Sequence, residues 1–541
     1  MNISWFVESH GILSPTQCGF RKNHSTYDQL TLLENKIRIA TNSNETCIVV
    51  FIDLTGAFDR VWHMGILEKL RQAGIKGRML GWLRSYLNNR KFSVFVEGEE
   101  SSTRPITSGV PQGAILSPLL FNIMLRDIPK VDGVTYSEYA DDIAIYSTGI
   151  NRALLISKLQ EAINRFVEWA NAWGQEVNPS KTKAMFFSKA NLKPEPIRLN
   201  NLEVEYVDRY KFLGLNLDSP KLTFKTHINS LKSKCTKSLS ILKFLSNVKW
   251  GSDRRTLDML YKTLVRSRMD YACHLYGNAC QTDLKSLDII QNQCLRLILG
   301  AQSTSPIVSL EVESNVPPLM LRRKYLSAKY YYRISEYSSM NPVNKIFDYP
   351  NNRNTYLNKT RILFNDWRLP SPSFTSRDYT TFPPWYDIGY LICENFGISN
   401  VKLLSNQITQ AAFNHLIESK YNNYTQIFTD GSKSSKTTSA FVIPSISLQN
   451  SYKLLDSASV LSSEFLAIDA ALKYLKSNPQ IMNSVIFTDS YSSVTLLRNR
   501  KTREPIARGI ITMLWELNIN RNIFIQWIPG HQGIRGNEQC S

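Results

Sequence analysis

The sequence lacks any long hydrophobic run, although hydrophobic residues make up 43% of its 541 residues. A membrane-spanning helix needs ~20 consecutive apolar residues, and the N-terminus lacks the charged and then apolar segments of a signal peptide. The sequence therefore predicts a globular protein without a membrane partner. Its length is sufficient for several domains, each with its own core.

Closely spaced cysteines are also missing. The eight cysteines include no Cys-x-x-Cys pair and no nearby Cys/His cluster with the spacing of a zinc site. We therefore expect free thiols, as in proteins of a reducing intracellular compartment.

Acidic residues are scarce relative to basic ones. The 45 Asp and Glu residues are outnumbered by 64 Lys and Arg residues, which gives a net charge of +19. Such a chain favours a polyanionic partner, with nucleic acid ahead of an anionic membrane surface. Between residues 221 and 268, twelve basic residues accompany only Asp253 and Asp258. They form either a solvated helical face or a surface that follows a nucleic-acid backbone, and their mutual repulsion favours the second. The twelve are Lys221, Lys225, Lys232, Lys234, Lys237, Lys243, Lys249, Arg254, Arg255, Lys262, Arg266 and Arg268.

Two adjacent acids are the most informative feature. Asp141 and Asp142 lie between two β-prone runs, which predicts a hairpin with two carboxylates at its tip. A continuous apolar run at residues 46–52 predicts a buried strand that ends at Asp53. The pair alone could be a solvated acidic turn. Together, three carboxylates from two strands favour a site for a hard cation such as Mg²⁺.

Several motifs in this order resemble the reverse transcriptases of non-LTR (LINE-type) retrotransposons of the jockey and I-element kind. The resemblance covers residues from about 10 to 335. The motifs are Gln17-Cys-Gly-Phe-Arg-Lys-Asn-His-Ser-Thr26, Phe51-Ile-Asp-Leu-Thr-Gly-Ala-Phe-Asp-Arg-Val-Trp-His63, Ser108-Gly-Val-Pro-Gln-Gly113, Tyr139-Ala-Asp-Asp142, Asn178-Pro-Ser-Lys-Thr182 and Tyr210-Lys-Phe-Leu-Gly214.

The resemblance implies a right-hand polymerase whose palm carries Asp53, Asp141 and Asp142 as ligands of two Mg²⁺ ions, with Mn²⁺ as a possible substitute. It also implies an RNA template, a DNA primer at the chromosomal target, deoxynucleoside triphosphates as substrates, and a nuclear location after a cytoplasmic ribonucleoprotein stage. The oligomeric state is open.

Four further residues have roles implied by the resemblance. Phe58 would lie under the sugar of the incoming nucleotide and exclude a 2′-hydroxyl, or it is a core aromatic residue. Gln112 would line the nucleotide pocket. Arg21 would lie in the fingers near the triphosphate, or it is a surface residue. Lys181 would either donate a proton to the pyrophosphate or pair with a phosphate.

The last part of the chain has the pattern β-β-β-α-β-α-β of a compact α/β domain. Its motifs are Ile427-Phe-Thr-Asp-Gly-Ser432, Ser463-Glu464, Phe487-Thr-Asp-Ser490 and Trp527-Ile-Pro-Gly-His-Gln-Gly-Ile-Arg-Gly-Asn-Glu538, and they are similar to those of ribonuclease H domains. The resemblance implies a second two-metal site at Asp430, Glu464 and Asp489, assisted by His531. Alternatively, His531 is an ordinary loop histidine. After Asn537-Glu538, the family pattern would place a fourth metal-binding Asp, whereas this chain has Cys540-Ser541. We therefore expect little or no cleavage of RNA. Earlier finger segments and an endonuclease belong to the family pattern as well, so we expect the chain to be a fragment.

The predicted fold class is therefore α/β (α+β), as a fingers–palm–thumb polymerase followed by a ribonuclease H-like domain. We place fingers and palm at residues 1–220, a basic helical thumb at 221–335, a connector at 336–422 and the ribonuclease H-like domain at 423–541. The predicted function is RNA-directed DNA polymerase. The alternatives are a catalytically impaired nucleic-acid-binding remnant and, disfavoured by Phe58, a polymerase that makes RNA.

Overall fold

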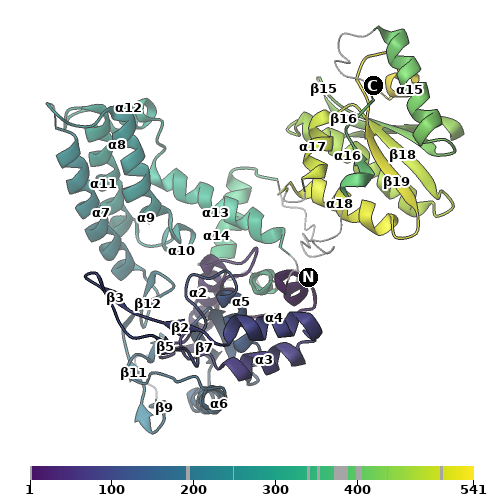
Figure 1. Cartoon of the computed structure of the whole chain (residues 1–541). Helices are drawn as coiled ribbons and strands as arrows, with labels where there is room; N and C mark the ends of the chain where they lie inside the picture. Colours follow the sequence, from purple (N-terminus) through teal and green to yellow (C-terminus); the bar gives the residue numbers. More distant parts are fainter. Residues whose placement is uncertain are drawn as a thin grey trace. The chain divides into compact units, whose positions relative to one another are not determined.

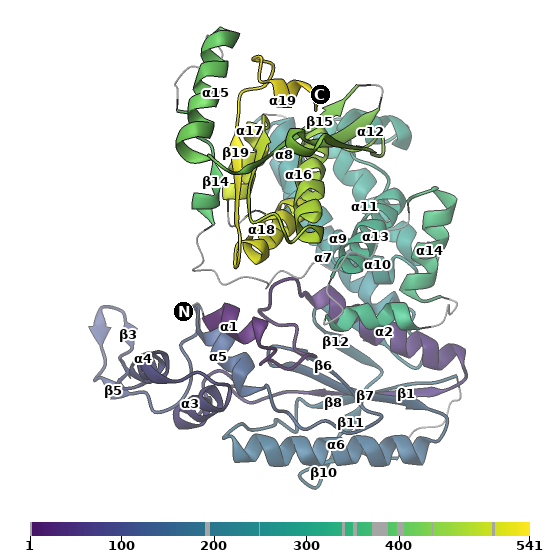
Figure 2. The same ribbon diagram turned by 90° about the vertical axis from the view of Figure 1, so that its right-hand side faces the viewer.

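The chain folds into two compact units, which are shown in a computed structural model (Figures 1 and 2). The structure describes residues 3–189, 195–247, 249–337, 341–349, 354–370, 388–397, 405–434, 436–499, 502 and 504–540. One unit comprises His10–Arg377, and the other comprises Asp378–Ser541 together with Met1–Ser9. Helix α1 (Ile3–Ser9) lies in the latter short segment.

The first unit is built on a five-stranded sheet in the order β11-β8-β1-β7-β6. Its strands are β1 (Thr46–Ile52), β6 (Thr135–Tyr139), β7 (Asp142–Gly149), β8 (Lys183–Phe187) and β11 (Glu205–Tyr206). Strand β1 is buried along its whole length, as expected for a central strand with both faces covered. Helix α2 (Thr26–Asn42) covers one face and α6 (Arg152–Ala172) the other (Figure 2).

Between the sheet strands, the chain forms a helical pair, a short-stranded arm and another helix. These elements are α3 (His63–Gln72), α4 (Gly77–Leu87), β2 (Lys91–Phe92), β3 (Phe95–Val96), β4 (Glu99–Glu100), β5 (Arg104–Pro105) and α5 (Ser117–Met124). The sequence predicts one strand over residues 92–97, whereas the structure has two exposed two-residue strands there. Strand β2 pairs with β5 and β3 with β4 in two separate two-stranded sheets, and the residues of both strands are exposed.

A helical bundle follows two small hairpins in the first unit (Figure 1). The hairpins are β9 (Arg198–Leu199) with β10 (Leu202–Glu203), and β12 (Arg209–Phe212) with β13 (Leu215–Asp218). The helices are α7 (Lys225–Leu245), α8 (Arg254–Tyr261), a π-helical turn η1 (Lys262–Arg266), α9 (Ser267–Asp270), α10 (Cys273–Tyr276), α11 (Gln281–Leu299), α12 (Ile307–Ser314) and α13 (Leu319–Ser335). One hydrophobic core runs from β1 through the second hairpin into this bundle.

Eleven of the twelve basic residues that the sequence places between residues 221 and 268 are exposed. All five lysines of α7 that the sequence singles out are at the surface, whereas Arg266 is buried at 7% exposure. Arg266 lies in the π-helical turn, where its side chain faces the core of the bundle. It therefore cannot belong to a solvent-facing basic surface.

The segment predicted as a connector is divided between the two units. Its first part contains η2 (Pro342–Asp348) and α14 (Tyr356–Asp366), whose apolar residues join the core of the first unit. Its second part contains η3 (Gly389–Leu391), β14 (Ile392–Cys393) and α15 (Asn406–Lys420), and β14 pairs in parallel with β19 of the second unit. Because residues 336–422 are largely polar in sequence, their composition gives no indication of these packing contacts.

The second unit has a six-stranded sheet in the order β14-β19-β18-β15-β16-β17. Its remaining strands are β15 (Thr425–Lys433), β16 (Thr437–Ile443), β17 (Leu448–Lys453), β18 (Asn483–Thr488) and β19 (Asn522–Trp527). Its helices are η5 (Pro444–Ile446), α16 (Val460–Ser477), α17 (Tyr491–Arg498), α18 (Pro505–Leu517) and α19 (Arg535–Glu538). This order confirms the predicted α/β pattern.

Two further predictions concern the whole chain. All eight cysteines are free, as the sequence predicts. None of the helices in the described residues combines the length and apolar character needed to cross a membrane.

Candidate active sites

Three acids in the described part of the chain lie at one end of the first sheet, but their carboxylate oxygens are not gathered within 4.8 Å of one another. Strand β1 pairs antiparallel with β7, with Ile52 opposite Ile143, so Asp53 and Asp142 follow as neighbours on adjacent strands. Asp141 precedes Asp142 in the turn of the β6–β7 hairpin. The sheet thus brings together carboxylates that are about 90 residues apart in the sequence.

The environment of these acids fits a cation. The Oδ2 atom of Asp53 has no hydrogen-bond partner among the described residues, and the Nζ of Lys181 lies 3.8 Å from it. Asp142 is accessible to solvent, but partial desolvation raises the pKa of its carboxyl, and the charges of Asp141 and Asp53 raise it further. A bound cation would relieve this repulsion.

The loop at residues 178–182 is attached to Asp53 through the backbone. The Asn178 N–H donates to the Asp53 carbonyl at 2.8 Å, and the Asp53 N–H donates to Thr182 Oγ1 at 3.4 Å. These bonds bring the exposed side chain of Lys181 beside the acids. Its role toward pyrophosphate or phosphate stays a prediction.

Phe58 and Gln112 lie on neighbouring segments near the same end of the sheet. The Phe58 ring stacks on Phe121 with centroids 4.3 Å apart and an angle of 18° between the planes. Phe58 is nevertheless only partly buried. Gln112 is exposed, and its Nε2 donates to Asp59 Oδ1 at 3.2 Å. Both therefore retain a surface for a ligand, and their roles at a nucleotide stay predictions.

Arg21 is engaged by the loop on which it lies. Its guanidinium donates to the carbonyls of Ser14 and Gln17 at 3.1 and 3.0 Å. These bonds give Arg21 a structural function, and its role near a triphosphate stays a prediction.

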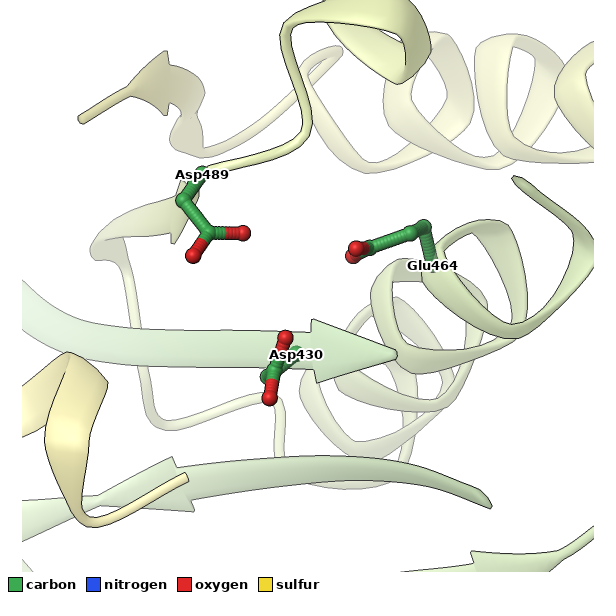
Figure 3. Close-up of side chains that lie close together, drawn as sticks. All are labelled: Asp430, Glu464 and Asp489. Carbon is green, nitrogen blue, oxygen red and sulfur yellow. The ribbon is translucent and has the colours of Figure 1, made fainter. Parts of the chain in front are cut away.

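The second unit contains a tighter acidic cluster (Figure 3). Asp430 lies on β15, Glu464 on α16 and Asp489 just after β18. One carboxylate oxygen from each lies within 4.8 Å of the others, and this is the only such metal-ligand group of three in the part of the chain that the structure describes. The three carboxylates point into one space (Figure 3).

Electrostatics indicate that this cluster also fits a cation. Burial and the charges of Asp489 and Asp430 raise the pKa of Glu464 to about 9. Burial and the charge of Asp430 raise the pKa of Asp489 as well. Glu464 Oε2 is buried without a hydrogen-bond partner among the described residues. Carboxylate oxygens in this arrangement suit a divalent metal ion.

His531 lies on the loop that follows β19. It has a left-handed backbone with φ of 53° and is exposed. Its charge lowers the pKa of Asp489, which places the imidazole within electrostatic range of the cluster. A part in proton or product movement stays a prediction.

Two residues at these sites were missed by the sequence analysis. Asn537 Nδ2 donates to Asp489 Oδ2 at 3.1 Å, and Gln17 makes hydrogen bonds to the turn that carries Asp141. Both contacts join segments far apart in the sequence, so neither leaves a local pattern. Gln17 had one weak signal, which is its place in a motif next to Gly19.

Comparison with known families assigns both units. Residues 3–217 match the family "Reverse transcriptase (RNA-dependent DNA polymerase)", and residues 422–541 match the family "RNase H". The two acid sites fall one in each matched segment.

Curated relatives include polymerases of Drosophila mobile elements. The chain is 32% identical over 301 residues to the probable RNA-directed DNA polymerase from transposon X-element of Drosophila melanogaster, covering 55% of this chain and 33% of that protein. It is 31% identical over 331 residues to the RNA-directed DNA polymerase from mobile element jockey of Drosophila funebris, covering 59% and 36%. The corresponding protein from transposon BS of Drosophila melanogaster is 33% identical over 299 residues, covering 53% and 33%.

The chain spans about a third of the length of these relatives. Among solved structures, a foamy viral protease-reverse transcriptase in complex with an RNA/DNA hybrid aligns over 96% of this chain and 68% of that one, at 14% identity and a TM-score of 0.24. The sequence relatives and family matches, and not this low score, support the assignment. The chain contains a reverse transcriptase domain followed by an RNase H domain, and it is related to the RNA-directed DNA polymerases of non-LTR retrotransposons.

Proposed function

We propose that this protein is an RNA-directed DNA polymerase that copies the RNA of a non-LTR retrotransposon into DNA. The observation that carries the proposal is the placement of Asp53 and Asp142 on adjacent strands with Asp141 in the turn, inside the segment that matches the reverse transcriptase family. The named activity of the curated relatives supports it.

Asp53, Asp141 and Asp142 would hold two divalent cations, for which Mg²⁺ is the proposed species and Mn²⁺ a substitute. Metal ions bound there would neutralise charge on the attacking and leaving oxygens of nucleotidyl transfer. The primer 3′-hydroxyl would attack the α-phosphate of a deoxynucleoside triphosphate. Lys181, beside Asp53, would bind the triphosphate or donate a proton to the departing pyrophosphate.

The sugar of the incoming nucleotide would lie against Phe58, and the ring would then exclude a 2′-hydroxyl. The ring is held in place by stacking on Phe121. Gln112, on the neighbouring loop, would line the same pocket. This arrangement favours deoxynucleotides over ribonucleotides.

Template and primer would bind along the exposed lysines of α7, because their charge is suited to a phosphate backbone. The net charge of +19 supports a nucleic-acid partner. Nicked chromosomal DNA as primer would require a nuclear stage, which we propose for this protein.

Primer extension on an RNA template tests the proposal. We expect the parent to extend a DNA primer. Asp142→Asn should reduce the rate at least ~100-fold, because losing a metal ligand should cost at least as much as losing a residue that hydrogen-bonds to a ligand. Asp132→Asn, an exposed acid just before β6, is the matched control and should extend like the parent. Absence of extension by the parent, together with intact hybrid binding, would instead favour the catalytically impaired binding remnant.

The RNase H unit is a second candidate catalytic site because its three carboxylates already lie close together. We propose that it binds a divalent cation and an RNA–DNA hybrid. The expectation of little RNA cleavage stays a prediction. Mg²⁺-dependent loss of the RNA strand that is abolished by Asp430→Asn would contradict it.

A further inference from the structure

We propose that Gln17 is a positioning residue that fixes the turn carrying Asp141 and Asp142. Its carboxamide bonds to the backbone of Ala140, the residue immediately before the two acids. The kinetic part of this inference rests on the proposed polymerase function, whereas the structural part does not.

The carboxamide of Gln17 is fully buried, and both its oxygen and its nitrogen form hydrogen bonds. Its Oε1 accepts hydrogen bonds from the N–H of Ala140 at 2.8 Å and the N–H of Gly19 at 2.7 Å. Its Nε2 donates to the Ala140 carbonyl at 3.3 Å. One side chain therefore engages both backbone polar groups of the residue at the turn.

Ala140 requires such support because its backbone is strained. Its φ is +56°, in the left-handed region that is unfavourable for a residue with a Cβ. The closing pair of the hairpin is Tyr139 with Asp142, so only Ala140 and Asp141 form the turn. Without outside hydrogen bonds, the turn could relax to a less strained conformation and move both acids.

The loop around Gln17 is itself built for close approach to the turn. A Cβ on Gly19 would clash with the Ala140 nitrogen and lie 3.0 Å from both Ala140 Cα and Gln17 Oε1. The Gly19 carbonyl accepts a hydrogen bond from Asn122 Nδ2 at 2.7 Å. The loop is therefore anchored to α5 and in backbone contact with the turn.

Gln29 offers a matched control on the same edge of the sheet. It is also buried, and its Nε2 donates to Thr16 O at 2.6 Å and to Glu138 O at 3.2 Å. Its Oε1 accepts from Ser137 Oγ at 2.7 Å. Gln29 thus joins the same loop to strand β6, but in the described part of the chain it makes no hydrogen bond to Ala140 or Asp141.

The experiment compares Gln17→Met with Gln29→Met, since methionine keeps the length of the side chain without its hydrogen bonds. Three quantities are measured in the full chain: hydrogen–deuterium exchange of the peptide spanning residues 134–146, Mn²⁺ binding by electron paramagnetic resonance, and steady-state primer extension. For Mn²⁺ binding, both variants carry Asp430→Asn and Asp489→Asn to suppress the RNase H site.

We expect Gln17→Met to accelerate exchange at the turn at least ~10-fold, weaken Mn²⁺ binding ~10–100-fold and lower kcat by a similar factor, with the KM for the deoxynucleotide within ~2-fold of the parent. Gln29→Met should lower thermal stability to a similar extent but leave Mn²⁺ binding and kcat within ~3-fold of the parent.

Equal effects of the two variants on Mn²⁺ binding and turn exchange would overturn the inference. If Gln17→Met does not fold, Gln17→Glu is used instead: one carboxylate oxygen can still accept both N–H bonds, while the other replaces the donating Nε2 and repels the Ala140 carbonyl oxygen. Unchanged exchange at the turn in that variant would also overturn the inference. If the parent makes no DNA, the proposed function fails, while exchange and Mn²⁺ binding still decide the role of Gln17.

Discussion

Replacing Gly431 by alanine should separate the acids of the RNase H site. Gly431 follows Asp430 on β15, and its backbone touches the first part of α16, where Glu464 lies. An added Cβ would collide with the Glu464 nitrogen and lie 2.6 Å from the Ser463 carbonyl carbon and 2.8 Å from Glu464 Cα. These are backbone atoms, so no side-chain rotation can make room.

The size of the effect follows from these contacts. Ordinary contact begins at 3.4 Å, so the Ser463 carbonyl carbon must retreat by about 0.8 Å from the added Cβ and the Glu464 nitrogen by more. Overpacking of this kind costs ~1–3 kcal/mol of stability. A displacement near 1 Å can reduce the efficiency of a catalytic arrangement ~100-fold. We therefore expect Mn²⁺ affinity at the three carboxylates to fall at least ~10-fold, with the unit still folded.

Isothermal titration calorimetry with Mn²⁺ measures this affinity in a chain carrying Asp142→Asn, which suppresses the other acid site. Gly509→Ala is the matched control, because a Cβ there meets nothing within 4 Å and the residue lies inside α18. That control should bind Mn²⁺ normally and stabilise the unit by ~1 kcal/mol through helix propensity. If Gly431→Ala binds Mn²⁺ as tightly as Gly509→Ala, close packing of β15 and α16 does not position the carboxylates.

Three other predictions concern the reverse transcriptase unit. Burial lowers the pKa of His227 to about 4 and of His274 to about 3. Below pH 6.5 the unfolded chain therefore takes up protons at these histidines that the folded chain does not. Each histidine should lower the free energy of unfolding by about 1.4 kcal/mol at pH 5.5. Urea unfolding at pH 7.5 and 5.5 should show this loss, reduced in a variant with both histidines changed to glutamine; an equal loss in that variant would refute it. Phe58→Ala should increase ribonucleotide incorporation at least ~10-fold in single-nucleotide extension, and unchanged discrimination would mean that the ring is only a packing residue. Three exposed lysines of α7, Lys225, Lys232 and Lys237, can be replaced together by glutamine. This change should weaken binding of an RNA–DNA hybrid and reduce the magnitude of the slope of log K against log salt concentration by about 2–3. An unchanged slope would mean that the nucleic acid binds elsewhere.

The acids of the first site could be predicted from the sequence because each lies next to a strongly patterned element, whereas those of the second site were predicted through the resemblance to ribonuclease H domains. Asp53 ends a fully apolar strand, and Asp141 and Asp142 separate two strands that pair as a hairpin. Asp430 lies within β15, and Asp489 directly follows β18. Local pattern fixes where such residues occur along the chain, and strand pairing then brings them together.

Other features depend on contacts that the sequence does not encode locally. Gln17 is 123 residues from Ala140, and its type alone gives no indication of burial. The polar stretch at residues 336–422 hides α14, whose apolar side chains pack into the first unit. Arg266 looks like part of a basic surface but is buried by the π-helical turn. In each case tertiary packing overrides the compositional signal.

The two acid sites share one physical requirement, which is direct backbone contact at a glycine. A Cβ at Gly19 would strike the turn before Asp141, and a Cβ at Gly431 would strike the helix that bears Glu464. A Cβ at Gly530 would lie 2.6 Å from Asp489 Oδ2. None of these three glycines has a positive φ, so space and not backbone freedom explains them. At Gly19 and Gly431 the nearest blocking atoms belong to the backbone and cannot move aside as side chains do, and at Gly530 they belong to the Asp489 side chain itself. Alanine at these positions should therefore displace carboxylates directly, and metal binding should suffer more than folding.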